Sequence, residues 1–192
     1  MIAQAAALAE LIPLAIAAWQ DLKRREIDIV VIAAMYVPAA IALYYSFRPM
    51  YIFSLGLGAV LAAVMRATGS GYADSLAILA LSLFPPPFIF LPTPAVIIIG
   101  TLIPLVGTAL WLALANRGRP CKMTWSQRLT HICAKREEVL RHPYRYIVGE
   151  AEDLERYTPP REIEGEYVVA KYGTPYVAYL AVGYLLYLAL II

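Results

Sequence analysis

The chain has 192 residues, of which 61% are apolar and 16% are charged, with a net charge of +2 and a mean hydropathy of +0.65. A soluble domain is roughly half apolar and a quarter charged, and a core of this size cannot take up the excess. The composition excludes an ordinary soluble globule, a disordered chain and a nucleic-acid-binding domain, and it predicts an integral membrane protein.

Apolar segments follow one another along the chain. They run from Ala5 to Trp19, interrupted by Glu10, from Ile29 to Phe47, from Pro49 to Met65, from Ser75 to Asn116 and from Tyr172 to Ile192. A transmembrane helix needs roughly 20 residues, so the Ser75 segment is far too long for one crossing. Its middle carries prolines that cannot continue a helix, namely Pro85, Pro86, Pro87, Pro92 and Pro94. We therefore expect an all-α polytopic membrane protein with six transmembrane helices.

The basic residues predict the orientation of these spans. Lys23, Arg24 and Arg25 directly follow the first span, and basic residues mark the cytoplasmic side of a membrane. With six alternating spans, every Lys and Arg except Arg48 falls on that side. We expect a multi-pass plasma-membrane protein with both termini outside. If the proline-rich turn were re-entrant, everything after it would face the other way.

The sequence divides into three regions. Residues 1–116 hold transmembrane helices 1 to 5, residues 117–171 form the only extended polar segment, and residues 172–192 hold helix 6. The polar segment contains most of the charged residues of the chain. We expect it to be a small α+β insert on the cytoplasmic side.

Local patterns predict the elements of this insert. Thr124 with Gln127 three residues later is a capping-box pattern. The apolar spacing that follows predicts one helix as far as Leu140. Residues 144–148 and 166–172 have the composition of short strands.

Acidic residues in or near membrane spans are costly, so each is a candidate functional residue. Asp21 ends the first span and Asp74 opens the fourth, and the predicted topology places both at the cytoplasmic face. Taken singly, Asp21 could be an interfacial residue paired with the adjacent basic triplet, and Asp74 could be a helix N-cap. If the first and fourth spans pack together, the two carboxylates face each other, and two carboxylates that share a site cannot both ionise cheaply. One would act as general base on a water and the other as general acid on a carbonyl, as in aspartic proteases.

The residues before Asp74 suit the approach of a substrate. Gly69 and Gly71 allow positive φ and a close approach of another backbone, so a substrate strand could lie against this loop. Tyr72 and Ala73 complete the loop.

Three short motifs, in order along the chain, resemble one family. Asp21 followed by the basic run from Lys23 and by Glu-Ile resembles the first catalytic motif of the type IV prepilin peptidases. Gly71-Tyr72-Ala73-Asp74 resembles their Gly-x-Gly-Asp motif, in the form that the archaeal branch relaxes to a hydrophobic third residue. Tyr172 to Val177 is similar to a Pro-Gly-Ile-Pro-Phe stretch at the same place in the family. Six spans with an insert before the last also resemble the archaeal preflagellin (prearchaellin) peptidases.

The resemblance implies an activity and a partner. It implies a membrane-embedded GxGD-type aspartic endopeptidase with Asp21 and Asp74 as catalytic dyad, Lys23 and the 69–73 loop as supporting residues, and no metal or cofactor. The substrate would be a preflagellin or type IV pilin-like precursor, cut at the cytoplasmic face between a short basic leader and a hydrophobic helix. The bacterial Cys-x-x-Cys segment is not in this sequence, which argues against methyltransferase activity. The partners expected are this precursor and membrane lipid, without nucleic acid.

A basic leader would need acidic residues to recognise it. The run from Glu150 to Glu155 contains four of them, with a solvated charged face as the ordinary interpretation. Glu26 and Asp28 could also offset the basic surface, although Asp28 fits the first turn of the second span equally well.

Two further groups of residues have ordinary interpretations. Glu10 lies about three helical turns from Asp21 on the same helix face, where we expect it to be hydrogen-bonded to a neighbouring span. Cys121, His131, Cys133 and His142 match no zinc spacing, and we expect free thiols in a reducing cytoplasm.

Two alternatives stay open. A presenilin-like protease shares the Gly-x-Gly-Asp aspartate, but such enzymes are larger and their aspartates lie deeper in the bilayer. A small transporter or membrane scaffold would use its acids as proton or cation ligands, and these would lie near the midplane.

Overall fold

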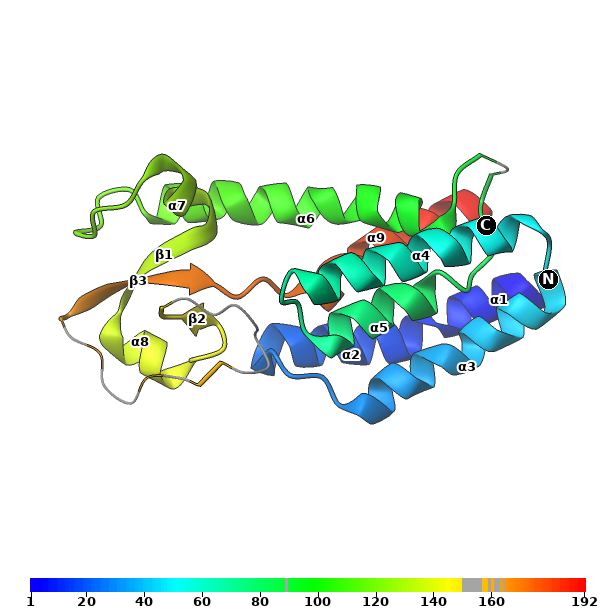
Figure 1. Ribbon diagram of the computed structural model, residues 1–192, viewed down its shortest axis with the longest axis horizontal. Helices are drawn as coiled ribbons and strands as arrows, with labels where there is room; N and C mark the ends of the chain where they lie inside the picture. Colours follow the sequence, from blue (N-terminus) through cyan, green and yellow to red (C-terminus); the bar gives the residue numbers. More distant parts are fainter. Residues whose placement is uncertain (89, 150–156, 159, 161–162, 164) are drawn as a thin grey trace. The chain divides into compact units, whose positions relative to one another are not determined.

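A computed structural model of the chain describes residues 1–88, 90–149, 157–158, 160, 163 and 165–192. It is mostly helical and contains a small antiparallel sheet (Figure 1). The chain forms two compact units, one of Met1–Ile103 with Pro175–Ile192 and the other of Pro104–Thr174. We call the first the helical unit and the second the sheet unit.

In the part of the chain that the structure describes, four helical stretches are long and apolar enough to cross a membrane. They are Ile2–Arg24, which comprises α1 (Ile2–Ala9) and α2 (Leu11–Arg24), then α3 (Ile29–Ser46), α4 (Met50–Ala67) and α6 (Thr93–Ala115). Two further apolar helices are shorter, α5 (Tyr72–Leu81) and α9 (Tyr176–Ile191). The structure therefore has helices at all six predicted places, but two of them fall below the length of an ordinary crossing.

The proline-rich segment separates α5 from α6 as predicted. Prolines lack the backbone N–H that a continuing helix needs, so α5 ends at Leu81, four residues before Pro85. The Thr93 hydroxyl donates to the Phe84 carbonyl at 2.8 Å and closes the turn. Phe88 and Leu91 form an isolated antiparallel bridge within it.

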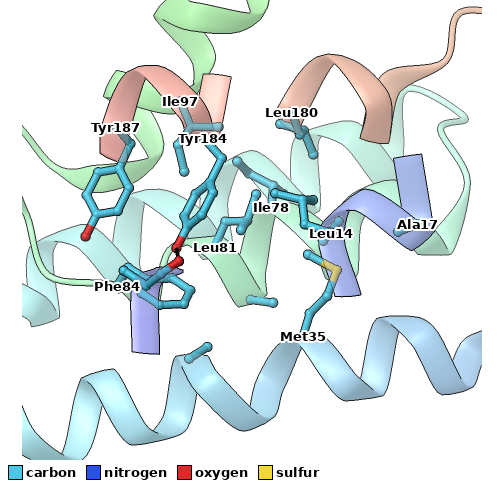
Figure 2. Close-up of a cluster of buried hydrophobic side chains, with 14 of the residues drawn as sticks. Leu14, Ala17, Met35, Ile78, Leu81, Phe84, Ile97, Leu180, Tyr184 and Tyr187 are labelled. Atoms are coloured by element: carbon cyan, nitrogen blue, oxygen red, sulfur yellow. Dashed lines mark hydrogen bonds between the residues drawn. The ribbon is translucent and has the colours of Figure 1, made fainter. Parts of the chain in front are cut away.

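The core of the helical unit lies where α2, α3, α5 and α9 meet (Figure 2). Apolar side chains from these helices pack with Phe84, Tyr184 and Tyr187, whose rings contact one another. The Tyr184 hydroxyl donates to the Ala7 carbonyl at 2.8 Å, and that of Tyr187 donates to the Pro85 carbonyl at 2.9 Å. These bonds satisfy polar groups that apolar surroundings would otherwise leave unpaired.

Glycines allow two pairs of helices to approach closely. A Cβ at Gly183 of α9 would overlap the Ile97 carbonyl of α6, and one at Gly58 of α4 would overlap the Ser82 side chain just after α5. Small residues at such contacts let backbones approach, which is how helices in membranes commonly pack.

The sheet unit contains α7 (Trp125–Thr130), β1 (His131–Lys135), α8 (Arg136–Arg141), β2 (Tyr146–Ile147) and β3 (Tyr167–Tyr172). The strand order is β1-β3-β2, and both pairs are antiparallel. The predicted capping box at Thr124 and Gln127 is confirmed, and β2 and β3 fall within the predicted strands.

The prediction of one helix as far as Leu140 was wrong. Residues 131–135 form a strand because they pair with β3 along their whole length, from His131 opposite Lys171 to Lys135 opposite Tyr167. Trp125 and Leu140, which had suggested a helical apolar face, are 79% and 44% exposed. Tertiary pairing therefore overrides the local spacing.

The prediction of free thiols was also wrong. Cys121 and Cys133 form a disulfide across 12 residues and tie the segment before α7 to β1. Cys133 is fully buried in the sheet, so its sulfur atom, which is bonded to that of Cys121, is not exposed to solvent. The two cysteines are consequently not available as metal ligands.

Candidate functional site

Asp21 lies in the last turn of α2 and is 5% exposed. Its Oδ2 accepts the backbone N–H of Ala178 at 3.1 Å, and the backbone of Val177 also donates to the carboxylate. Both donors belong to the first turn of α9, whose N–H groups have no partner within their own helix. A carboxylate at this position is stabilised by the positive end of the helix dipole. Asp21 therefore caps a helix that begins more than 150 residues later in the chain.

Asp74 is the third residue of α5, after the N-cap Gly71. Its carboxylate reaches back to the backbone of Gly71, which is the side-chain half of a capping box. The prediction that Asp74 could itself be the N-cap is therefore wrong by three residues. From this position Asp74 interacts electrostatically with Asp21 and Arg25. The structure thus brings the two predicted aspartates into one site, between the end of α2 and the beginnings of α5 and α9.

The loop before Asp74 is built only partly as predicted. Gly69 has φ of +82°, a conformation that side chains rarely adopt. Gly71 is extended, with φ of −61°, and a Cβ there would lie 3.9 Å from the Asp74 carboxylate, so the freedom to adopt positive φ is used at Gly69 and not at Gly71. Tyr72 is exposed, with the Arg66 guanidinium 4.0 Å from its ring centre, and Ala73 packs against the core.

The three basic residues at the end of α2 make different contacts. Lys23 is exposed and holds its ammonium 4.2 Å from the Trp19 ring centre, and Arg24 is also exposed. Arg25 turns back instead and places Nη1 3.8 Å from the Asp21 carboxylate. Lys23, a predicted supporting residue, therefore makes its contact with Trp19, whereas Arg25, which was not predicted as a supporting residue, contacts Asp21.

Sequence reasoning missed Tyr176 as a member of the site, and it offered the basic triplet as a partner of Asp21 without singling out Arg25. Tyr176 is the first residue of α9 and interacts electrostatically with Asp74. A signal for it was present, since Tyr176 lies in the 172–177 motif that opens the last helix. Nothing in the sequence distinguishes Arg25 from its two basic neighbours.

Glu10 is fully buried in the helical unit and lies between α1 and α2. Neither carboxylate oxygen has a hydrogen-bond partner among the described residues, so the prediction of a bond to a neighbouring span is wrong. Glu10 interacts electrostatically with Tyr184, whose hydroxyl already donates to Ala7. A buried acid without donors is far more stable in its neutral form.

The remaining candidates lie away from the aspartates or beyond what the structure describes. The acidic run from Glu150 to Glu155 lies outside the described residues. Asp28 is the N-cap residue of α3, and its carboxylate accepts a hydrogen bond from the Gln20 amide at 2.7 Å.

Within the described part of the chain, no three His, Cys, Asp or Glu residues are placed to hold a metal ion. Partial burial and the nearby Lys171 lower the pKa of His131, which favours its neutral form.

No protein family matches the chain, and no curated protein or solved structure is significantly similar to it.

Proposed function

We propose that this protein is a membrane-embedded aspartic endopeptidase that removes the short basic leader of preflagellin or type IV pilin-like precursors. The observation that carries the proposal is the meeting of Asp21 and Asp74 at the ends of three helices. The two carboxylates are near enough to interact, with Asp21 buried and Asp74 partly buried among the surrounding helices. A pair of this kind favours one shared proton, which is the working state of an aspartic protease.

The surroundings of the two aspartates suggest different roles. Asp21 accepts N–H groups from α9 and has Arg25 beside it, so it suits the ionised general base that takes a proton from the attacking water. Asp74 would hold the shared proton and donate it to the carbonyl oxygen of the scissile peptide. The proton taken up by Asp21 would then pass to the leaving amine as the C–N bond breaks, and a hydroxyl of the gem-diol intermediate would return its proton to Asp74 as the new carboxyl group forms. No metal or cofactor enters these steps.

The proposal includes the membrane arrangement expected from the basic residues. Six spans would place Asp21, Asp74 and the 117–171 insert at the cytoplasmic face and both termini outside. The substrate would then be cut where its basic leader meets its hydrophobic helix. In this arrangement the aspartates would lie at the membrane face. That location would fit a prepilin or preflagellin peptidase better than a presenilin-like protease, whose aspartates lie deeper.

The test is a cleavage assay in detergent or lipid vesicles. The native chain is mixed with a precursor that has a basic leader and a pilin-like helix, beside Asp21→Asn and Asp74→Asn. These changes keep shape and remove charge, and we expect each to lower kcat at least about 100-fold while the thermal unfolding midpoint stays within a few degrees. Native-like cleavage by both variants would remove the catalytic assignment.

The buried Glu10 favours transport as a second candidate function. An acid inside the helical unit without hydrogen-bond partners among the described residues could bind and release a proton. Glu10→Gln separates the two functions, because the protease proposal expects normal cleavage from this variant. If Glu10→Gln abolished a proton or cation flux that Asp74→Asn left intact, transport would replace proteolysis.

A further inference from the structure

Arg25 has an unusual backbone conformation directly after α2. With φ of 60° and ψ of 18°, it is the one non-glycine residue in the described part of the chain with positive φ. A left-handed conformation is unfavourable for a residue that has a Cβ, and it persists only where surrounding contacts hold it. A glycine would adopt this turn without strain, so the presence of arginine calls for a reason in its side chain.

Contacts on both sides hold the turn in place. The Arg25 N–H donates to the Asp21 carbonyl at 3.2 Å. The Gln20 amide and Asp28 are joined by two hydrogen bonds, from Nε2 to Oδ2 at 2.7 Å and from the Asp28 N–H to Oε1 at 3.0 Å. These bonds close the loop between α2 and α3, so the chain turns back on the end of α2.

The turn directs the Arg25 side chain into the aspartate site. The side chain is only 8% exposed, and Nη1 lies 3.8 Å from Asp21 Oδ1 and donates to the Asp21 carbonyl at 3.3 Å. The same guanidinium interacts electrostatically with Asp74. One cation therefore acts on both carboxylates.

Among the described residues, Arg25 is the cation that acts on Asp74, and the titratable side chains of the helices packed around the site have the following partners. Tyr176 of α9 interacts with Asp74 through its phenol, which is neutral at ordinary pH. On α3, the Tyr36 hydroxyl donates to the Leu76 carbonyl at 2.9 Å. On α4, the Arg66 guanidinium stacks on Tyr72 and donates to the Ser70 carbonyl.

The charges of the site balance in one protonation state. Two ionised carboxylates and one guanidinium leave a net negative charge, whereas two carboxylates that share one proton leave none. Because an uncompensated charge is expensive away from water, the neutral combination is favoured when a substrate covers the site. That combination holds one base and one acid, as the proposed reaction requires.

We infer that Arg25 is the counter-charge of the aspartate pair, a positioning residue that fixes Asp21 and balances the single negative charge of the working dyad. Its role in turnover rests on the proposed function. Its effect on the ionisation of Asp21 and Asp74 does not, because that effect depends only on their proximity.

Four variants of the full-length chain test this inference. Arg25→Gln removes the cation, Arg25→Gly removes it and also relieves the turn, and Arg25→Lys keeps the charge. Arg24→Gln is the matched control, since Arg24 is an exposed neighbour. The ionisation of the aspartates is followed in detergent by infrared difference spectroscopy, with Asp21→Asn and Asp74→Asn used to assign the carboxyl bands. This titration needs no substrate.

We expect Arg25→Gln and Arg25→Gly to move the carboxyl titration about one pH unit higher. The guanidinium, 3.8 Å from Asp21, favours the ionised carboxylates, and both variants remove this effect. Arg25→Lys should keep most of the native position, and Arg24→Gln should coincide with it. In the cleavage assay, the acid limb of kcat should move by the same amount in the first two variants, with KM changed less than about twofold. A loss of stability alone would not move this limb.

Two results separate the inference from the proposed function. If both Arg25→Gln and Arg25→Gly titrate like the native chain, the counter-charge role is overturned, whatever the cleavage assay shows. If the native chain cuts no precursor at any pH but the carboxyl titration moves as expected, the inference holds and the proposed protease function fails.

Discussion

At the scale of residues, Asp21 and Asp74 differ in what fixes them. Asp21 is held by α9, a helix from the other end of the chain, whereas Asp74 is held by the N-cap of its own helix. The geometry of the pair therefore depends on the contact between α2 and α9 as well as on the 69–71 loop. A change in that loop should move Asp74 without disturbing Asp21.

The two glycines of the loop give a matched prediction. Gly69→Ala should destabilise the helical unit by about 1–2 kcal/mol, because alanine resists a φ of +82°. Gly71→Ala should change stability by less than about 0.5 kcal/mol, because φ is already that of an ordinary extended residue and the space beside it is sufficient. Thermal unfolding in detergent, followed by tryptophan fluorescence, measures both. Equal losses in the two variants would contradict this account of the loop.

The sequence alone predicted that Asp21 and Asp74 would lie at the same end of their helices, and that they would face each other if the first and fourth spans packed together. It left open whether the two carboxylates are close without substrate. It did not predict which of three consecutive basic residues would join them. Lys23, Arg24 and Arg25 are equivalent as charges, and a single left-handed residue decides that only the last one turns inward. The backbone conformation of one non-glycine residue has no signal in composition or periodicity.

At the scale of elements, the helices pack through a few close contacts that only glycine permits. Long uncharged apolar segments, together with the prolines that interrupt the longest of them, placed the apolar helices well. Sequence periodicity failed at residues 131–135, where pairing with β3 formed a strand across a segment with helical spacing. Local patterns predict an element when its partners are local, and they fail when a distant strand supplies the hydrogen bonds.

The contact between α6 and α9 gives a prediction at this scale. Gly183→Ala should lower the thermal midpoint, by the equivalent of about 1–3 kcal/mol, because the added methyl overlaps the Ile97 carbonyl and backbone cannot yield as a side chain can. Gly56→Ala is the control, because nothing lies within 4 Å of a Cβ there. We expect Gly56→Ala to be neutral or more stable by up to about 1 kcal/mol, since alanine is the better helix former. The reverse order would show that α6 and α9 do not pack as described.

At the scale of the whole molecule, the number of crossings decides on which side of the membrane the insert lies. Six crossings agree with the distribution of Lys and Arg, but α5 has only 10 residues, about 15 Å of helix. A hydrocarbon core is about 30 Å thick, so α5 needs the following segment to complete a crossing. The Cys121–Cys133 disulfide bears on the same question, because disulfides persist in oxidising compartments and, inside cells, mainly in hyperthermophiles.

Three exposed positions distinguish six crossings from four. In a Cys121→Ser, Cys133→Ser background, single cysteines are introduced as Arg48→Cys, Thr68→Cys and Lys122→Cys, and intact cells are treated with a membrane-impermeant maleimide. Six crossings place position 48 outside and positions 68 and 122 inside, so only Arg48→Cys should react. If α5 and α9 do not cross, α6 carries the insert to the outside, and Lys122→Cys should react as well. Thr68→Cys reports the face of the aspartates and stays protected in both cases. A reactive Lys122→Cys would therefore move the insert to the outside and leave the proposed dyad on the cytoplasmic side.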